Sequence, residues 1–404
     1  MDGRIAITGV GAVSPAGIGA GAFWKGLLAP DDRRSRWSRE DLSRYPGMAV
    51  VEIPRGVLDA IGVHDGGHDG GHGGTLAHRL VRHGVEQALC AAGLDAGRGA
   101  GRVGCFLATT TAGVDAFSDA ITGRAEPGPA LDPAGILAAP GQDWRGPAAV
   151  LSTACSSGLI APALAADAIA GGEAEAMVAG GVDVLLEYTL CGFAGLRLAT
   201  DDRCRPFSRE RRGVVLSEGM ACVCLEPLAA ALERRADVLA VILGYALNCD
   251  AGHMTAPDPD GVGRAMAEAL DTAGVDRRAV GGVFAHGTGT QANDVAEAEA
   301  LRRAFGAAGV PPVTAVKSTM GHPQAAAGAF SLLAAVAALR DGVLPPTSGF
   351  QEPDPALAGI DVVAGRPRPL VSRCVMVDAF GFGGNNGVMV VADLATAQRG
   401  RHGH

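Results

Sequence analysis

The feature that most constrains the fold is a repeated order of motifs in the two halves of the chain. In each half, a helical pattern that ends in glycine precedes an apolar run leading into threonines, and a small-residue turn then opens an alanine-rich helix. The corresponding segments are 89–95, 109–111 and 152–155 in the first half, and 270–276, 287–290 and 318–322 in the second. Two such correspondences in the same order predict an internal duplication, with its boundary between residues 226 and 240.

Apolar runs and helical patterns alternate along both halves, which predicts an α/β fold. We expect strands at 4–10, 103–108, 148–152, 176–179, 282–285, 312–316, 373–380 and 387–392. We expect helices at 75–92, 156–170, 263–273 and 323–339. On this basis the N-terminal half is 1–235, the C-terminal half is 236–395, and 396–404 form a flexible tail.

The composition excludes several classes of protein. Hydrophobic residues make up 48% of the 404 residues, which is enough for a large core. The net charge of −9 argues against a nucleic-acid binder, because phosphate contacts need a basic surface. The longest apolar stretch, 325–339, is too short to span a membrane, and the N-terminus has no apolar signal core. We therefore expect a cytoplasmic protein that contacts neither membrane nor nucleic acid.

The cysteines and histidines do not form a recognisable metal motif. The nine cysteines lack metal-ligand spacing and fit free thiols in a reducing compartment. Residues 64–74 contain three histidines four residues apart. A glycine-rich chain does not hold side chains at helical spacing, so we interpret this segment as a mobile surface loop. We expect no bound metal.

Cys155 is the strongest candidate nucleophile. It follows a predicted buried strand and stands at the start of a predicted helix, among the small residues of 151–158. Unpaired N–H groups and the positive end of the helix dipole lower the pKa of a thiol at such a position and favour the thiolate. The alternative is a buried structural role, which we assign to most of the other cysteines, including Cys222 and Cys224.

Two histidines occupy comparable positions in the second half. His286 ends the strand 282–285 and precedes the segment 287–290, and His322 precedes Pro323 at the start of a helix. A helix N-terminus disfavours the imidazolium form, so the ring stays neutral and donates from Nε2. A thiol that accepts an acyl group, with two neutral donors on a thioester oxygen, suits carbon–carbon bond formation through an enolate. It suits hydrolysis less well, because a hydrolase needs a base beside the nucleophile.

These motifs resemble those of the condensing β-ketoacyl-[acyl-carrier-protein] synthases of the thiolase superfamily, over about residues 4–394. The resemblance rests on 153–157 (TACSS), 286–290 (HGTGT), 317–318, 321–322, 325–328 (AAAG) and 380–386 (FGFGGNN). It implies a thiolase-like fold, with two duplicated βαβαβαββ halves in a five-layered α-β-α-β-α arrangement. It implies no bound cofactor, because substrates arrive on the phosphopantetheine arm of acyl carrier protein. It also implies a dimer.

The resemblance implies a role for each matching residue. Cys155 would carry the acyl chain, while His286 and His322 decarboxylate a malonyl thioester and hold its enolate. The backbone N–H groups of Cys155 and Phe382 would form the oxyanion hole. The other implied positions are Lys317, Glu297 and Asp294 as residues that order the site around His322, Phe382 and Gly383 as the gate, Thr288 and Thr290 as contacts of the pantetheine arm, Thr111 and Phe193 as the wall of the acyl tunnel, and Arg197 and Arg205 as docking contacts for acyl carrier protein.

Some positions depart from the family's usual residues. They are Arg212, Val214, Ser217 and Asn385, and they flank the gate. The segment 64–74 replaces a stretch that often carries basic residues for carrier-protein docking.

Two other functions stay open. A thiolase would need a second reactive cysteine near the C-terminal glycine loop, and 380–386 contains none. A non-catalytic chain-length-factor subunit usually lacks the nucleophile that Cys155 supplies. We therefore expect decarboxylative condensation with malonyl-acyl carrier protein, as a homodimer or as a heterodimer with a chain-length-factor-like subunit.

The pathway is either type II fatty-acid or polyketide and polyene biosynthesis. We favour the second, because the threonines at 109–111 would make an acyl tunnel polar. The alternative is that these hydroxyls bond to the protein itself and never meet the substrate.

Overall fold

The computed structural model describes residues 3–39, 48–63, 74–94, 101–121, 123 and 132–399. The loop expected at 64–74 lies outside the described residues except for its last glycine. Residues 396–399, expected in a flexible tail, continue the helix Leu394–Arg399, and 400–404 lie outside the description.

The chain alternates strands and helices. The strands are β1 (Ile5–Ser14), β2 (Gly17–Ile18), β3 (Val50–Val51), β4 (Val103–Ala108), β5 (Ala148–Leu151), β6 (Ala176–Asp183), β7 (Leu216–Ser217), β8 (Gly219–Pro227), β9 (Ala240–Cys249), β10 (Gly282–Phe284), β11 (Val313–Thr314), β12 (Val343–Leu344), β13 (Arg368–Pro369), β14 (Cys374–Phe380) and β15 (Asn385–Ala392). The α-helices are α1 (Ala20–Leu28), α2 (Arg55–Ala60), α3 (Leu76–Ala92), α4 (Val114–Ile121), α5 (Ser157–Ala170), α6 (Glu187–Gly195), α7 (Leu228–Glu233), α8 (Pro259–Ala273), α9 (Gln291–Phe305), α10 (Lys317–Met320), α11 (Ala327–Asp341) and α12 (Leu394–Arg399).

The topology of the large sheet contains the predicted duplication. The order in the first half is β5-β4-β6-β8-β1, and the order in the second is β11-β10-β14-β15-β9. Numbered within each half, both read 3-2-4-5-1, and in both the fifth strand is antiparallel to its two neighbours. The halves join where β1 pairs with β9.

The glycine-ended motifs of the sequence are equivalent helix ends. α3 stops at Gly93 and α8 stops at Gly274, with φ of 65° and 63°. Glycine adopts this left-handed conformation without strain and so ends a helix before the next strand. The repeat in the sequence is therefore a repeated helix end in the fold.

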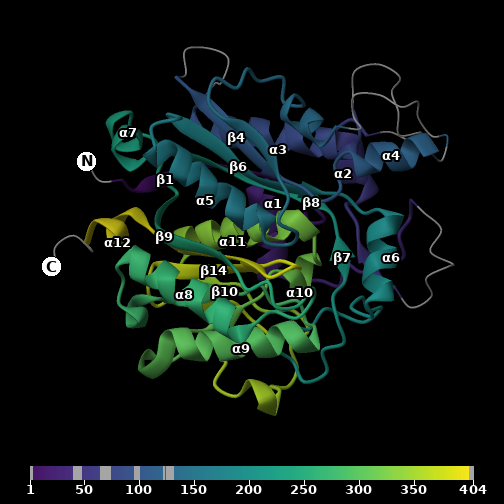
Figure 1. Ribbon diagram of the computed structural model, residues 1–404, viewed down its shortest axis with the longest axis vertical. Coiled ribbons are helices and arrows are strands. Elements are labelled where there is room, and N and C mark those ends of the chain that lie inside the picture. Colours follow the sequence, from purple (N-terminus) through teal and green to yellow (C-terminus); the bar gives the residue numbers. More distant parts are fainter. Residues whose placement is uncertain are drawn as a thin grey trace.

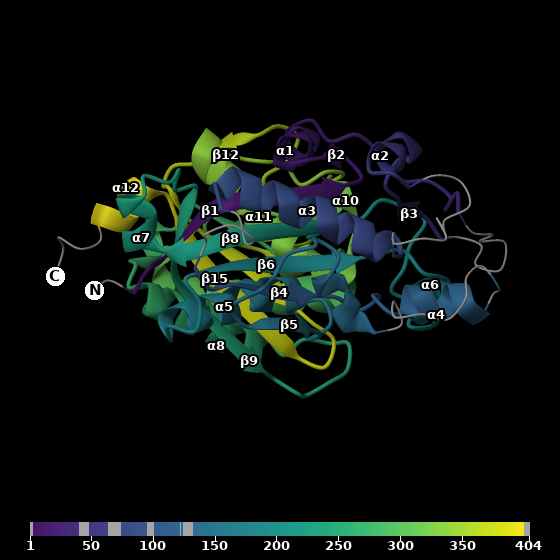
Figure 2. The same ribbon diagram turned by 90° about the horizontal axis from the view of Figure 1, so that it is seen from above.

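Helices and sheet form five layers, as predicted (Figures 1 and 2). α3 covers the outer face of the first half, while α8 and α9 cover that of the second. α5 and α11 pack against each other between the two halves. They are buried nearly all round, which fits helices that carry apolar residues on every side. α5 and α11 match predicted helices, and β8 contains the apolar strand predicted around Cys222 and Cys224, whereas β9 and α9 were not predicted.

Candidate active site

A strained turn between β5 and α5 presents Cys155. Ala154, which precedes it, has a φ of 54°, a left-handed conformation that residues with a side chain rarely adopt. The Ser157 hydroxyl holds this turn, because it accepts the Thr153 N–H at 2.7 Å and donates to the Ala154 carbonyl at 2.5 Å. The Cys155 side chain is 6% exposed and lines a pocket.

The glycine-rich loop between β14 and β15 packs directly on this turn. A Cβ at Gly381 would lie 2.5 Å from the Thr153 carbonyl oxygen, so only glycine permits the approach. The backbone N–H groups of Phe382 and Cys155 both face the Cys155 sulfur. These are the two predicted oxyanion donors. Gly383, also predicted here, donates its N–H to the Met254 carbonyl at 2.8 Å instead.

The electrostatics of Cys155 differ from the prediction of a lowered pKa. Burial raises the pKa of the thiol to about 12, and the nearby Asp183 carboxylate adds to the rise. The Lys317 ammonium and the two backbone N–H groups lower it but do not compensate. The sequence places the residue at a helix N-terminus, but the depth of burial follows from packing that the sequence does not show. The thiol is therefore protonated before a substrate binds.

Hydrogen bonds to Nδ1 fix the orientation of His286. The Phe380 N–H donates to Nδ1 at 3.2 Å, and Lys317 Nζ lies 3.2 Å from the same atom. Because Nδ1 accepts, the ring proton sits on Nε2. Lys317 Nζ also donates to the His286 carbonyl at 2.5 Å. Glu297 accepts the N–H groups of His286 and Gly287 at 2.7 and 2.9 Å.

Lys317, Glu297 and Asp294 were predicted to order the site around His322, but the structure places them around His286. Asp294 accepts the N–H groups of Gly289 and Phe207, which holds the segment after His286. All three side chains are buried. Burial lowers the pKa of Lys317 and raises the pKa values of the two carboxyls.

His322 faces His286 across the pocket. The two ring centroids are 5.8 Å apart at an interplanar angle of 88°. Backbone bonds to β7 and the residue before it hold His322: its N–H donates to the Val215 carbonyl at 2.7 Å, and its carbonyl accepts from the Ser217 N–H at 3.0 Å. Burial and the Lys317 charge hold the pKa values of both rings well below the usual value of 6.5, so both are neutral at physiological pH.

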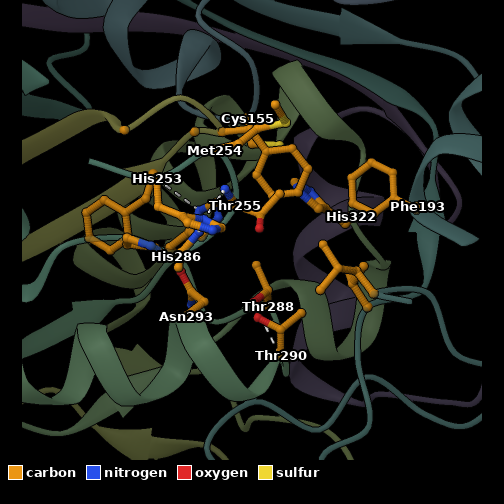
Figure 3. Close-up of a pocket in the computed structure, with 18 residues that line it drawn as sticks. Cys155, Phe193, His253, Met254, Thr255, His286, Thr288, Thr290, Asn293 and His322 are labelled. Atoms are coloured by element: carbon orange, nitrogen blue, oxygen red, sulfur yellow. Dashed lines mark hydrogen bonds between the residues drawn. The ribbon is translucent and has the colours of Figure 1, made fainter. Parts of the chain in front are cut away.

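Cys155, His286 and His322 line one pocket of about 500 Å³ and converge on its centre (Figure 3). Thr288 and Thr290 line the side opposite Cys155, with their hydroxyls 2.9 Å apart. Phe193 from α6 stacks on Phe382, with centroids 5.6 Å apart. The pocket thus has a reactive end, a hydroxyl-lined side and an aromatic cover.

Two predicted positions form other contacts in the structure, and a third is exposed. Thr111 is fully buried, is not among the residues that line this pocket and donates to Asp183 at 2.8 Å, so its place on an acyl tunnel stays a prediction. Arg205 is bound to Asp202 at 2.6 Å, which leaves it less available for docking. Arg197 is exposed at the end of α6, next to the pocket-lining Leu198.

Residues 253–257 and Asn293 also line the pocket, although they were not predicted as site residues. The segment 253–257 follows β9 and is tied to the gate by the Gly383–Met254 bond and by a bond of 3.0 Å from the Asp250 N–H to the Gly384 carbonyl. Asn293 precedes Asp294 on α9 and donates to it. The sequence signal that could have identified Asn293 is its place next to Asp294 and close to Glu297, two predicted site residues.

The described part of the chain contains no cluster of three or more His, Cys, Asp or Glu side chains able to hold a metal ion. In the same residues, every helix is too short or too polar to cross a bilayer. All nine cysteines are free thiols.

Comparison with known proteins gives extensive matches. The N-terminal and C-terminal domain models of beta-ketoacyl synthase match residues 2–231 and 239–351. Nodulation protein E of Rhizobium meliloti is 34% identical over 402 residues, which cover 96% of this chain and 99% of that protein. The 3-oxoacyl-[acyl-carrier-protein] synthase 2 of Coxiella burnetii is 33% identical over 415 residues, which cover 96% and 98%.

The fold agrees with these matches. The solved structure of the ishigamide ketosynthase/chain length factor superposes with a TM-score of 0.87 at 29% identity, over 96% of this chain and 99% of that chain. A pocket that joins a thiol to two neutral imidazoles at the junction of two duplicated halves fits the same assignment. The chain belongs to the beta-ketoacyl synthase family and is a condensing acyltransferase.

Proposed function

We propose that this chain condenses an acyl group carried on Cys155 with malonyl-acyl carrier protein, giving β-ketoacyl-acyl carrier protein and carbon dioxide. The observation that carries the proposal is the convergence of one thiol and two neutral histidines in one pocket. The glycine-rich loop 380–386 contains no cysteine, and Cys155 is the one cysteine among the residues that line this pocket. Both facts disfavour a thiolase.

In the first half-reaction the Cys155 sulfur attacks the acyl thioester. The N–H groups of Cys155 and Phe382 stabilise the oxyanion that forms. The thiol proton passes to the departing pantetheine sulfur, so the step is neutral overall. Lys317 favours negative charge on the Cys155 sulfur while this proton moves.

In the second half-reaction the malonyl carbonyl oxygen accepts Nε2–H donors from His286 and His322. The malonyl carboxylate leaves as carbon dioxide. The electrons of the broken carbon–carbon bond form an enolate, which the two Nε2–H donors stabilise. The enolate carbon attacks the acyl carbon on Cys155, and the released thiolate takes up a proton. Phe193 and Phe382 keep water from the enolate.

The substrate arm and partner follow from the pocket's open side. The hydroxyls of Thr288 and Thr290 suit the amides of a phosphopantetheine arm. Substrates then arrive on acyl carrier protein, with exposed Arg197 as the docking contact and no further cofactor.

Among pathways, a polyketide or polyene route has the better support. It rests on the unusual residues beside the gate, of which Val214 lines the pocket, and on the likeness to the ishigamide ketosynthase/chain length factor. The threonines at 109–111 give no support to either pathway, because their three hydroxyls donate to Asp183. The partner subunit is a second copy or a chain-length-factor-like chain.

Two substitutions at Cys155 test the division of roles. Cys155→Ala should abolish the acyl adduct that intact-mass measurement detects after incubation with acyl-acyl carrier protein. Cys155→Gln should retain malonyl decarboxylation without condensation, because the amide mimics the acylated residue and both histidines remain. Cys90→Ala, which changes an exposed thiol on α3, is the matched control and should keep both reactions. An adduct that persists in Cys155→Ala would refute the assignment.

A further inference from the structure

Asp183, at the end of β6, is a fully buried carboxylate with an unusually complete set of donors. It accepts six hydrogen bonds of 2.6–2.9 Å: from the N–H groups of Thr110, Thr111 and Ala325, and from the hydroxyls of Thr109, Thr110 and Thr111. All six partners are donors, which matches an ionised carboxylate rather than an acid that must itself donate.

These donors come from two segments that the carboxylate ties together. Residues 109–111 follow β4, and Ala325 lies in the short 3-10 helix Gln324–Ala326, directly after His322 and Pro323. Gln324 has a φ of 44°, a conformation that a residue with a side chain adopts only when its surroundings hold it. The 2.6 Å bond from the Ala325 N–H to Asp183 supplies that hold.

Asp183 also acts on Cys155 through its charge. The charges that act on the Cys155 thiol are those of Asp183 from β6 and Lys317 from α10, and the neutral rings of His286 and His322 line the same pocket as the thiol. Asp183 raises the pKa of the thiol and Lys317 lowers it. Asp183 therefore contacts the turn that follows His322, and its charge disfavours ionisation of Cys155.

We propose that Asp183 is a positioning residue of the condensation, which fixes the turn that carries His322. This inference rests on the proposed function, since it assigns His322 to decarboxylation.

The test substitutes Asp183→Asn, which keeps the shape and removes the charge. In the Cys155→Gln background, kcat for malonyl decarboxylation should fall about tenfold with KM unchanged, since His322 moves while Thr288 and Thr290 do not. The control is Asp167→Asn on α5, an exposed carboxylate whose loss should change neither value.

A folded Asp183→Asn protein with unchanged kcat for decarboxylation overturns the proposal. Failure of the proposed function would appear separately, as absent decarboxylation in Cys155→Gln alone. If Asp183→Asn does not fold, Thr110→Val removes one donor and keeps the charge. It should lower kcat by a smaller factor, and a kcat equal to that of the parent protein overturns the proposal.

Discussion

His286 and His322 are both neutral for the same physical reason, but different contacts hold the two rings in position. Burial and the Lys317 charge keep both pKa values low, but His286 is oriented through Nδ1 and His322 through its backbone. A neutral ring can donate from Nε2 and also avoids forming an ion pair with the malonyl carboxylate that must leave. The site therefore stabilises charge that develops during the reaction rather than charge present at its start.

Replacing either histidine by alanine should lower decarboxylation by about 10²–10³-fold, the usual cost of losing one oxyanion donor. The double variant should lose much less than the product of the two factors, because both groups act on one oxygen. Carbon dioxide release in the Cys155→Gln background measures both effects, with His83→Ala on α3, a half-buried histidine outside the pocket, as the control. Full activity in either single variant would remove that histidine from the site.

Among single residues, the sequence points to Cys155, His286 and His322 because turn and helix-start signals are local, and the structure brings all three to one pocket. The sequence predicted the wrong direction for the pKa shift of Cys155, since the burial that raises this pKa depends on packing that the sequence does not show. It placed Lys317 beside the wrong histidine for the same reason.

Among elements, the contact between α5 and α11 sets the position of Cys155. A Cβ at Gly158 would lie 2.3 Å from the Ala325 carbonyl, and one at Gly328 would lie 2.6 Å from the Leu159 N–H nitrogen. The two central helices therefore touch backbone to backbone. This contact brings the helix that follows Cys155 against the segment that follows His322. The catalytic groups of the two halves are therefore positioned by one boundary, the close packing of α5 against residues 325–328.

Gly158→Ala should test that boundary. The added methyl must push α5 from α11, which should lower the free energy of unfolding by about 1–3 kcal/mol and reduce acylation of Cys155. Gly192→Ala on α6, where a Cβ would meet nothing within 4 Å, is the matched control and should be neutral or stabilising by up to about 1 kcal/mol. Denaturant unfolding measures both. Equal stability of Gly158→Ala and wild type would contradict the backbone contact.

At the scale of the whole molecule, the internal duplication was predictable from the sequence, but the pairing of β1 with β9 that joins the two halves was not. Glycine-ended helices and small-residue turns recur in the sequence because each half builds the same 3-2-4-5-1 sheet. The pairing of Ile5 with Ile242, which joins the sheets, has no local signal because it depends on the packing of two complete halves. The five layers accordingly came from family resemblance rather than from periodicity.

The surface of the described chain has features of a subunit. β5 ends the large sheet with no strand on its outer edge among the described residues, and Phe117 and Ile121 on α4 are 55% and 68% exposed. A free strand edge and exposed apolar side chains favour association with another chain. We therefore expect a dimer that covers α4.

The double variant Phe117→Lys/Ile121→Lys should convert this dimer to a monomer. Both side chains already face solvent in one chain, so the fold should tolerate the lysines, whereas burying two charges in an interface is costly. Sedimentation at about 10 µM protein measures the mass, a concentration at which a dimer with a micromolar or lower Kd is mostly assembled. Val371→Lys, at a site that is 87% exposed, is the control and should remain dimeric. A double variant that stays dimeric would place the interface elsewhere, and a monomeric wild-type chain would favour assembly with a different subunit.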